Sequence, residues 1–268
     1  MSKAIRITCA FLFLTLVGYP NAGGAEDNVP EDRSQFHLFL LVGQSNMAGR
    51  GEVRPEDRTP HERVLMLNKA GKWVPAVDPL HFDKPIAGSG LGKTFAIEYA
   101  EANPEVTVGL IPCAVGGSPI STWQPGATHK STGAKPYDDA IRRAKLAQQS
   151  GKLKGLLWHQ GEGDSRDGLA DVYESKLHAL IHRFRDELDA PEVPFIVGQL
   201  GQFDSRPWNS AKKKVDAAHR SLPEQLKATG FVSSDGLTHK GDDVHFDRKS
   251  LLEFGHRYFE VYRKVAAD

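Results

Sequence analysis

The stretch that decides the fold is FHLFLLVGQSNMAGRGE, residues 36–52. Its apolar run ends abruptly at Gly43, and Ser45, flanked by two amide side chains, follows almost at once. Near-continuous apolar character over residues 38–42 is typical of a strand buried on both faces of a parallel sheet. Ligands of such sheets bind beyond the carboxyl ends of the strands. The stretch therefore predicts a buried strand that carries Ser45 to the edge where chemistry is expected.

Apolar runs alternate with helical patterns along the rest of the chain. Strands are expected at residues 36–43, 63–67, 106–112, 153–159, 193–200 and 230–233, and helices near 92–102, 136–149, 169–189, 210–227 and 248–266. The pattern over 169–189 is the clearest, because its apolar residues recur at three- and four-residue steps. This alternation predicts an α/β fold with a doubly wound, mostly parallel central sheet and helices on both faces.

The N-terminal part is typical of an export signal. Residues 1–25 begin with Lys3 and Arg6, continue with an apolar run and close on small residues, in the order of a signal peptide. The run is short for a membrane span, and an uncleaved anchor is the alternative. Residues 26–34 are polar and are expected to be a loose segment, while residues 35–268 contain no linker or repeat and predict one domain. We therefore expect an exported protein, periplasmic or secreted.

Charge and cysteine content exclude several classes of protein. The 34 basic and 34 acidic residues balance, and removal of the leader takes two basic residues and leaves 32 − 34 = −2. This balance gives no electrostatic basis for binding nucleic acid or an anionic membrane. Cys113 is the one cysteine after the leader, so no internal disulfide is possible in the mature chain. A domain of about 240 residues buries a core large enough to do without one.

Polar residues follow three of the predicted strands and precede the last helix. Ser45 follows the first strand, Gly117 the third and Gln160 the fourth. Asp242 and His245 precede the last helix. Because parallel strands end at one edge of a sheet, we expect these residues to meet. A serine becomes a nucleophile when a histidine, oriented by an acid, removes its proton. The set predicts acyl transfer, with Ser45 as nucleophile, His245 as base and Asp242 as the orienting acid.

A tetrahedral intermediate also needs donors aimed at its oxyanion. The backbone N–H groups of Ser45 and Gly117 and the side-chain amide of Gln160 are the candidates. Each such donor is worth about 3–4 kcal/mol of barrier in enzymes. Taken singly, each residue has a plainer interpretation: a helix cap for Ser45, a turn for Gly117 and a surface amide for Gln160. Their joint placement at strand ends favours the catalytic interpretation.

These residues lie in four blocks that resemble those of the SGNH hydrolases. Within that superfamily, the blocks resemble those of the branch that contains carbohydrate esterase family 6 and the sialate O-acetylesterase-like domains. The blocks are GQSNMAGRG at 43–51, AVGGS at 114–118, WHQGEGDS at 158–165 and DDVHFD at 242–247. In the third block Gln stands where most SGNH enzymes carry Asn. The resemblance runs from about Phe36 to Tyr262.

The resemblance implies a flavodoxin-like SGNH hydrolase fold and a serine esterase that removes O-acetyl groups from carbohydrates. It implies no metal and no organic cofactor. An acetylated xylan-type polysaccharide is favoured over sialic acid as substrate, because the chain is a single compact domain without evident extra modules. Supporting roles are expected for Gln44, Asn46, His159 and Glu162. For Glu162 the alternative is a structural role, in which its carboxylate ties the loop to backbone N–H groups.

One alternative interpretation is a nucleotide-binding protein. AGSGLGKT, residues 87–94, satisfies a relaxed phosphate-loop pattern, but Ala87 stands where the strict pattern requires Gly. The preceding residues contain prolines and charges and do not predict a buried strand. Lys93 is therefore expected to cap or solvate the start of the following helix.

Two further alternatives use other residues. A metal-dependent deacetylase would draw its ligands from the acidic and histidine residues near the C-terminus, namely His239, Asp242, Asp243, His245 and Asp247. That interpretation leaves Ser45 without a role. Within the triad interpretation Asp243 is the second candidate acid, less well placed at i−2 from His245. A non-catalytic carbohydrate-binding domain would stack sugars on Trp123, Trp158 and Trp208, although tryptophans are more commonly buried.

Overall fold

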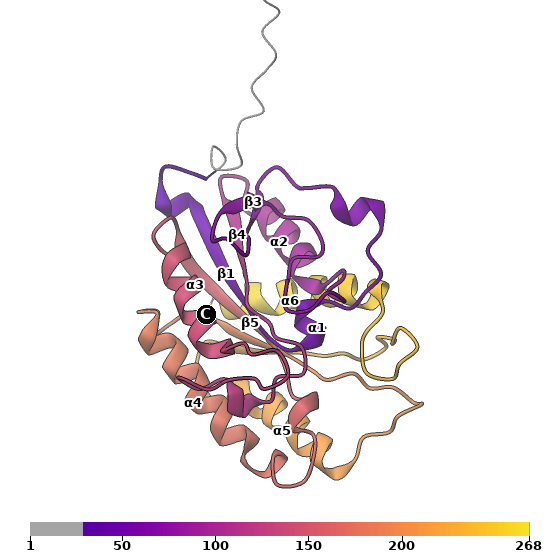
Figure 1. Ribbon diagram of the computed structural model, residues 1–268. Helices are drawn as coiled ribbons and strands as arrows, with labels where there is room; N and C mark the ends of the chain where they lie inside the picture. Colours follow the sequence, from indigo (N-terminus) through magenta and orange to yellow (C-terminus); the bar gives the residue numbers. More distant parts are fainter. Residues whose placement is uncertain (1–28, 268) are drawn as a thin grey trace, which may run out of the picture.

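A single sheet of seven strands organises the computed structural model, which describes residues 29–267. The strand order is β3-β2-β4-β1-β5-β6-β7 (Figure 1). The strands are β1 (Phe36–Gly43), β2 (Val64–Leu67), β3 (Trp73–Pro75), β4 (Thr107–Pro112), β5 (Lys152–His159), β6 (Phe195–Gly198) and β7 (Thr229–Val232). All neighbours pair in parallel except β2 and β3, which are antiparallel. The predicted mostly parallel sheet is confirmed.

Helices cover both faces of the sheet (Figure 1). They are α1 (Ser45–Ala48), α2 (Leu91–Ala102), α3 (Pro136–Ala147), α4 (Tyr173–Glu187), α5 (Ser210–Gln225) and α6 (Arg248–Val265). Alternate side chains of β1 point to opposite faces. Leu38 and Leu40 pack in a core with side chains of α3, α4 and α5, whereas Phe39 and Leu41 pack in a second core with those of α2 and α6. The doubly wound architecture is confirmed.

The differences from the predicted elements are small and have local causes. The antiparallel edge strand Trp73–Pro75 was not predicted, because three residues are too few to show an alternating pattern. The long helical pattern over 169–189 begins with a separate 3₁₀ turn, Ala170–Val172, before α4. The polar segment also ends in a 3₁₀ turn, Arg33–Gln35, so its last residues are ordered rather than loose. The predicted signal peptide lies outside the described residues.

The strand order reverses at β1, which lies at the centre of the sheet. The chain leaves β1 for the edge, returns as β4 on one side of β1, and then crosses to β5 on the other side. In open α/β sheets the ligand crevice forms at such a reversal, at the carboxyl ends of the strands. The loops after β1, β4 and β5 contain Ser45, Gly117 and Gln160. None of the helices between residues 29 and 267 is long and apolar enough to cross a membrane.

Candidate active site

The loop before α6 brings His245 onto Ser45. His245 Nε2 lies 2.9 Å from Ser45 Oγ, and its Nδ1 lies 2.7 Å from Asp242 Oδ2. The other carboxylate oxygen of Asp242 accepts from the backbone N–H groups of Val244 at 3.1 Å and His245 at 2.8 Å. Burial alone would raise the pKa of Asp242, but these hydrogen bonds lower it to about 2. A charged Asp242 can accept a hydrogen bond from the Nδ1–H of His245, which fixes the tautomer in which Nε2 is unprotonated and faces the Ser45 hydroxyl.

Asp243 points away from this contact. Its backbone φ is +57°, and its Oδ1 accepts from Ser205 Oγ at 2.5 Å and lies 3.2 Å from His239 Nε2. Asp247 instead caps α6 by accepting from the N–H of Ser250 at 2.8 Å. The acidic and histidine residues considered as metal ligands therefore divide among separate contacts. Within residues 29–267 no group of three or more His, Cys, Asp or Glu side chains is arranged to hold a metal ion.

A tight turn presents Ser45 at the end of β1. Gly43 has φ +132°, and a Cβ at this position would lie 2.2 Å from the carbonyl oxygen of His159. Only glycine allows β1 to approach β5 this closely. The N–H of Gln44 donates to the same oxygen at 2.8 Å, and Ser45 then begins the one-turn helix α1. The N–H of a first helical residue has no partner within its helix, so that of Ser45 is available to a ligand.

A buried ion pair joins the serine loop to the glycine loop after β4. Arg50 and Asp83, whose side chains are each 1% exposed, lie 2.8 Å apart. The same Asp83 oxygen accepts from the N–H of Gly116 at 2.8 Å, and Arg50 also donates to the carbonyl of Gly49 at 2.7 Å. Gly117 follows with φ +82°. The position of the Gly117 N–H relative to Ser45 thus depends on Asp83.

Replacement of Asp83 by alanine should destabilise the protein strongly, because it leaves the guanidinium of Arg50 buried and unpaired. We expect the free energy of unfolding to fall by about 3–5 kcal/mol. Urea denaturation of both proteins measures this loss. The control is Glu260→Ala, which removes an ion pair with Arg263 whose side chains are 48% and 57% exposed, and should cost less than about 1 kcal/mol. Equal losses of unfolding free energy in the two variants would show that burial of the Arg50–Asp83 pair does not increase its contribution to stability.

Gln160 does not take the position expected of an oxyanion donor. The side chain is fully buried, and its Nε2 lies 2.6 Å from Asp164 Oδ2, 3.2 Å from the carbonyl oxygen of Ser118 and 3.3 Å from Gln44 Oε1. Asp164 also accepts from the N–H of Ile120 at 2.8 Å. Both amide hydrogens are thus engaged within the protein. Gln160 ties together the loops after β1, β4 and β5 rather than facing the space above Ser45.

Asn46 clamps the loop that carries His245. Its Oδ1 accepts from the N–H of Phe246 at 3.1 Å, and its Nδ2 donates to the carbonyl of Val244 at 3.1 Å. These two backbone groups lie on either side of His245. The Asn46 amide also donates to Glu162 Oε1 at 2.6 Å. Asn46, which follows Ser45 directly, therefore ties the backbone on both sides of His245 to the serine turn.

Glu162 is held by the His159 and Asn46 side chains and also by its own backbone N–H. His159 is fully buried below it, with Nε2 3.7 Å from Glu162 Oε1. Burial would raise the pKa of Glu162, but the His159 ring, the backbone N–H of Glu162 itself and the Asn46 amide lower it to about 2. The carboxylate is therefore charged at neutral pH. By accepting a hydrogen bond from the Asn46 amide, it helps to fix the orientation of that side chain.

The lowered pKa makes Glu162 a source of pH-dependent stability. Its folded pKa of about 2 lies below the ordinary value of 4.5, so its contribution is complete above about pH 5 and is lost as pH falls towards 2. We expect the unfolding free energy of wild type minus that of Glu162→Gln to shrink by on the order of 3 kcal/mol across this interval. Urea denaturation at a series of pH values measures the difference. A difference that is constant with pH would contradict the assignment.

The phosphate-loop interpretation of Lys93 is not supported. Lys93 is buried, and its Nζ donates to the carbonyl oxygens of Asp57 and Thr59, each at 2.7 Å. Lys93 therefore does not face a phosphate site. It also does not cap or solvate the start of α2, which was the role expected for it. The preceding residues instead line the serine loop, because Ser89 forms an antiparallel bridge with Gly51.

The tryptophans considered as sugar-stacking platforms belong mainly to the core. Trp123 and Trp158 are fully buried, with ring centroids 5.1 Å apart, so neither offers a face to a ligand. Trp208 is half-buried, donates to the carbonyl of Gly201 at 2.8 Å and lies 5.1 Å from Lys212 Nζ. Of the three, Trp208 alone retains an exposed part.

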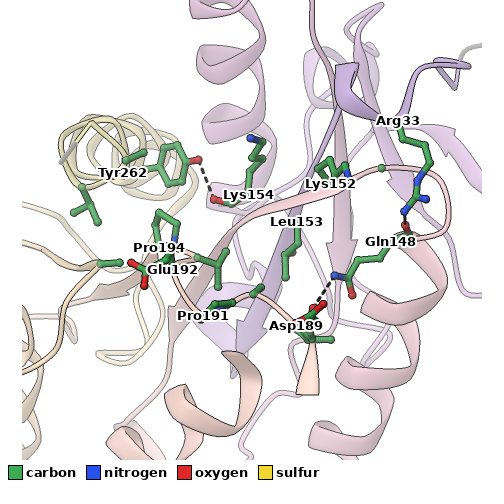
Figure 2. Close-up of a pocket in the computed structure, with 17 residues that line it drawn as sticks. Arg33, Gln148, Lys152, Leu153, Lys154, Asp189, Pro191, Glu192, Pro194 and Tyr262 are labelled. Atoms are coloured by element: carbon green, nitrogen blue, oxygen red, sulfur yellow. Dashed lines mark hydrogen bonds between the residues drawn. The ribbon is translucent and has the colours of Figure 1, made fainter. Parts of the chain in front are cut away.

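Of the hollows in the described chain, the one with the largest volume lies away from the candidate site and a smaller one lies beside it. A cavity of about 750 Å³ lies at the amino ends of β5 and β6, the end of the sheet away from Ser45 (Figure 2). There the Tyr262 hydroxyl donates to the carbonyl of Lys154 at 2.9 Å, and no predicted site residue lines the walls. A smaller hollow of about 290 Å³ is lined by Glu162 and Val244, directly beside the His245 loop. The second hollow is the one next to the candidate chemistry.

Three residues of the site had no role in the sequence-based prediction. Arg50 lies inside the first quoted block and Asp164 inside the third. The resemblance could therefore have indicated these two positions, but not the residues that they contact. Asp83 lies outside every block and gave no signal, because its partner Arg50 is 33 residues away in the chain.

The strand order and the loops that carry Ser45, Gly117 and Gln160 define an SGNH-like hydrolase. The chain belongs to the family described as "Carbohydrate esterase, sialic acid-specific acetylesterase", whose pattern matches residues 35–264. As a member of this family it is a carbohydrate O-acetylesterase, a carboxylic ester hydrolase.

Known relatives agree with this family. "Probable carbohydrate esterase At4g34215" of Arabidopsis thaliana is 28% identical over 210 residues, which are 76% of this chain and 75% of the relative. The crystal structure of that Arabidopsis protein superposes with a TM-score of 0.76 over 85% of this chain and 98% of the other. NanS superposes with a TM-score of 0.71 at 17% identity, over 87% and 98% of the two chains. XAC1771, a carbohydrate acetylesterase from Xanthomonas citri, has a TM-score of 0.65 at 22% identity, over 86% and 56%.

Proposed function

We propose that this chain is an exported serine esterase that removes O-acetyl groups from carbohydrates through Ser45, His245 and Asp242. The observation that carries the proposal is the continuous contact from Asp242 Oδ2 to the imidazole, at 2.7 Å, and from the imidazole to Ser45 Oγ, at 2.9 Å. The export part rests on the sequence of residues 1–25 alone.

Catalysis proceeds in two half-reactions. His245 Nε2 takes the proton of Ser45 as Oγ attacks the acetyl carbon, and the backbone N–H groups of Ser45 and Gly117 donate to the oxyanion. The C–O bond to the sugar breaks, and the leaving oxygen receives the proton from His245. Water, deprotonated by the same imidazole, then attacks the acetyl carbon; the bond from that carbon to Ser45 Oγ breaks, Oγ takes the proton back from His245, and acetate leaves. Asp242 holds the tautomer and stabilises the imidazolium in both halves.

The charges around the adjoining hollow favour a neutral sugar. Arg206 and Lys212 line it together with Glu162 and Asp243, so its cationic and anionic groups balance. Because the lining residues carry no excess positive charge, the hollow has no electrostatic means of selecting the carboxylate of a sialic acid. We therefore propose an acetylated xylan-type polysaccharide, or an oligosaccharide of it, as the substrate.

Acetate release tests the proposal. The purified mature protein is incubated with acetylated xylooligosaccharides and, separately, with O-acetylated N-acetylneuraminic acid, and acetate is quantified in the presence and absence of EDTA. We expect release from the xylooligosaccharides that EDTA does not change. Faster release from the sialic acid would overturn the substrate assignment, and loss of activity with EDTA would overturn the serine mechanism in favour of a metal-dependent deacetylase.

A further inference from the structure

We propose that Lys84 is a third, cationic contributor to the oxyanion site. In this role it is a catalytic residue whose ammonium group donates a hydrogen bond to the acetyl oxygen as that oxygen becomes negatively charged. This inference rests on the serine mechanism proposed above. It assigns a catalytic role to a loop residue outside all four motif blocks.

The first observation is the position of the Lys84 side chain over the glycine loop. A Cβ built on Gly116 would lie 3.6 Å from Lys84 Cδ, so the lysine stem runs along this glycine. A Cβ built on Gly117 would meet Lys84 Nζ at 4.0 Å and no other heavy atom within that distance. The space beside Gly117 is therefore open except for one ammonium group at its far side.

The second observation is that the backbone at Lys84 is held in place by its neighbour, whereas the Lys84 ammonium group has no bonded partner. The preceding residue, Asp83, is buried and bound both to Arg50 and to the N–H of Gly116. This anchors the start of the lysine side chain beside the oxyanion loop. The side chain of Lys84 forms no hydrogen bond or ion pair with any residue between 29 and 267, although it is half-buried; only its backbone carbonyl is engaged, by the N–H of Ala87 at 3.0 Å. Its ammonium is thus free to turn towards a ligand.

The third observation concerns the field of this charge around Gly117. The His129 ring, which contacts the Thr132 hydroxyl at 2.9 Å and the Ser131 hydroxyl at 3.2 Å, lies close enough to this loop for Gly117 and Lys84 to act on its pKa. Burial and then the positive charge of Lys84 lower the pKa of His129, while the Gly117 carbonyl acts in the opposite direction. The Lys84 charge therefore acts on a group near Gly117, in agreement with the position of its Nζ beside that glycine. An oxyanion bound to the Gly117 N–H would form within that field.

The chemistry of the site leaves a place for such a group. The amide of Gln160 is engaged by Asp164 and Ser118, so the protein presents two backbone donors, from Ser45 and Gly117. A cation at the edge of a partly desolvated site stabilises a developing negative charge more than it does a neutral ester. No covalent step and no proton transfer passes through Lys84. Its effect should therefore fall on kcat rather than on KM.

The test compares Lys84→Met, Lys84→Arg and the control Lys130→Met with wild type on 4-nitrophenyl acetate, a neutral substrate. Lys130 is exposed and lies next to His129, so its removal changes the net charge equally without touching the oxyanion loop. We expect Lys84→Met to lower kcat about 10- to 100-fold with KM within about twofold, below the effect of one backbone donor. Lys84→Arg should retain most activity, and Lys130→Met all of it.

A second readout separates catalysis from folding. Methylboronic acid forms a tetrahedral adduct with a nucleophilic serine, and its inhibition constant should weaken in Lys84→Met by the same factor as kcat/KM. Unchanged kcat in Lys84→Met, or a rise in KM alone, would overturn the role of Lys84. Hydrolysis that persists in Ser45→Ala would instead overturn the serine mechanism itself, so the two failures are distinguishable.

Discussion

Replacement of Ser45 by alanine is expected to lower kcat by about five to six orders of magnitude, as removal of the nucleophile does in other serine hydrolases. The Ser45 hydroxyl makes one hydrogen bond in the described chain, to His245, so its loss removes the nucleophile without removing a structural contact. Steady-state hydrolysis of 4-nitrophenyl acetate measures the loss, and urea denaturation should show an unchanged unfolding free energy.

A serine on the surface of the same domain provides the control. Ser175 is exposed on α4, where its hydroxyl donates to the carbonyl of Val172, and Ser175→Ala should hydrolyse the substrate at the wild-type rate. If Ser45→Ala kept more than about a tenth of the wild-type rate, the nucleophile would have to be sought elsewhere.

The second large effect is expected for Asp242→Asn, which should lower kcat/KM about 10⁴-fold. An asparagine amide can donate to His245 Nδ1, which would place the ring proton on Nε2 and leave that nitrogen unable to accept the serine proton. The pKa of Asp242 is about 2, so the wild-type carboxylate remains charged at every pH above about 4. Protonation of Asp242 should therefore cost the enzyme no activity above that pH.

The adjacent acid is a matched control for this prediction. Asp243 carries the same charge one residue away, but its carboxylate contacts Ser205 and His239 rather than His245. Asp243→Asn should therefore keep kcat/KM within about threefold of wild type, since it disturbs an exposed contact. The ratio of the two variants is measured in parallel assays at neutral pH. A reversed ranking would assign the orienting acid to Asp243.

The parts of the fold that could be predicted are those where burial imposes a pattern on the sequence. The run at 36–43 coincides with β1 because all but one of its residues are buried, which requires continuous apolar character. The strand Trp73–Pro75 escaped prediction because it lies at the sheet edge and takes its conformation from pairing with β2. Pairing with a distant segment leaves no local signature.

The candidate site was predictable to the extent that it depends on strand ends. Ser45 and Gly117 follow β1 and β4 as the parallel-sheet rule requires. The direction of the Gln160 amide was not predictable, because it is set by Asp164 and by the Ser118 carbonyl, which approach only in the folded chain. Residue type and spacing indicate that a donor is present, whereas its partners decide where the donor points.

Covalent labelling tests the central claim, the nucleophilic Ser45, most directly. The mature protein is treated with an alkyl fluorophosphonate, digested and mapped by peptide mass spectrometry, beside a His245→Ala variant. We expect one phosphonylated residue, Ser45, in the wild type and no label in the variant, because the imidazole 2.9 Å away activates the hydroxyl. Label on another residue, or equal labelling of Ser45 in the variant, would contradict this claim.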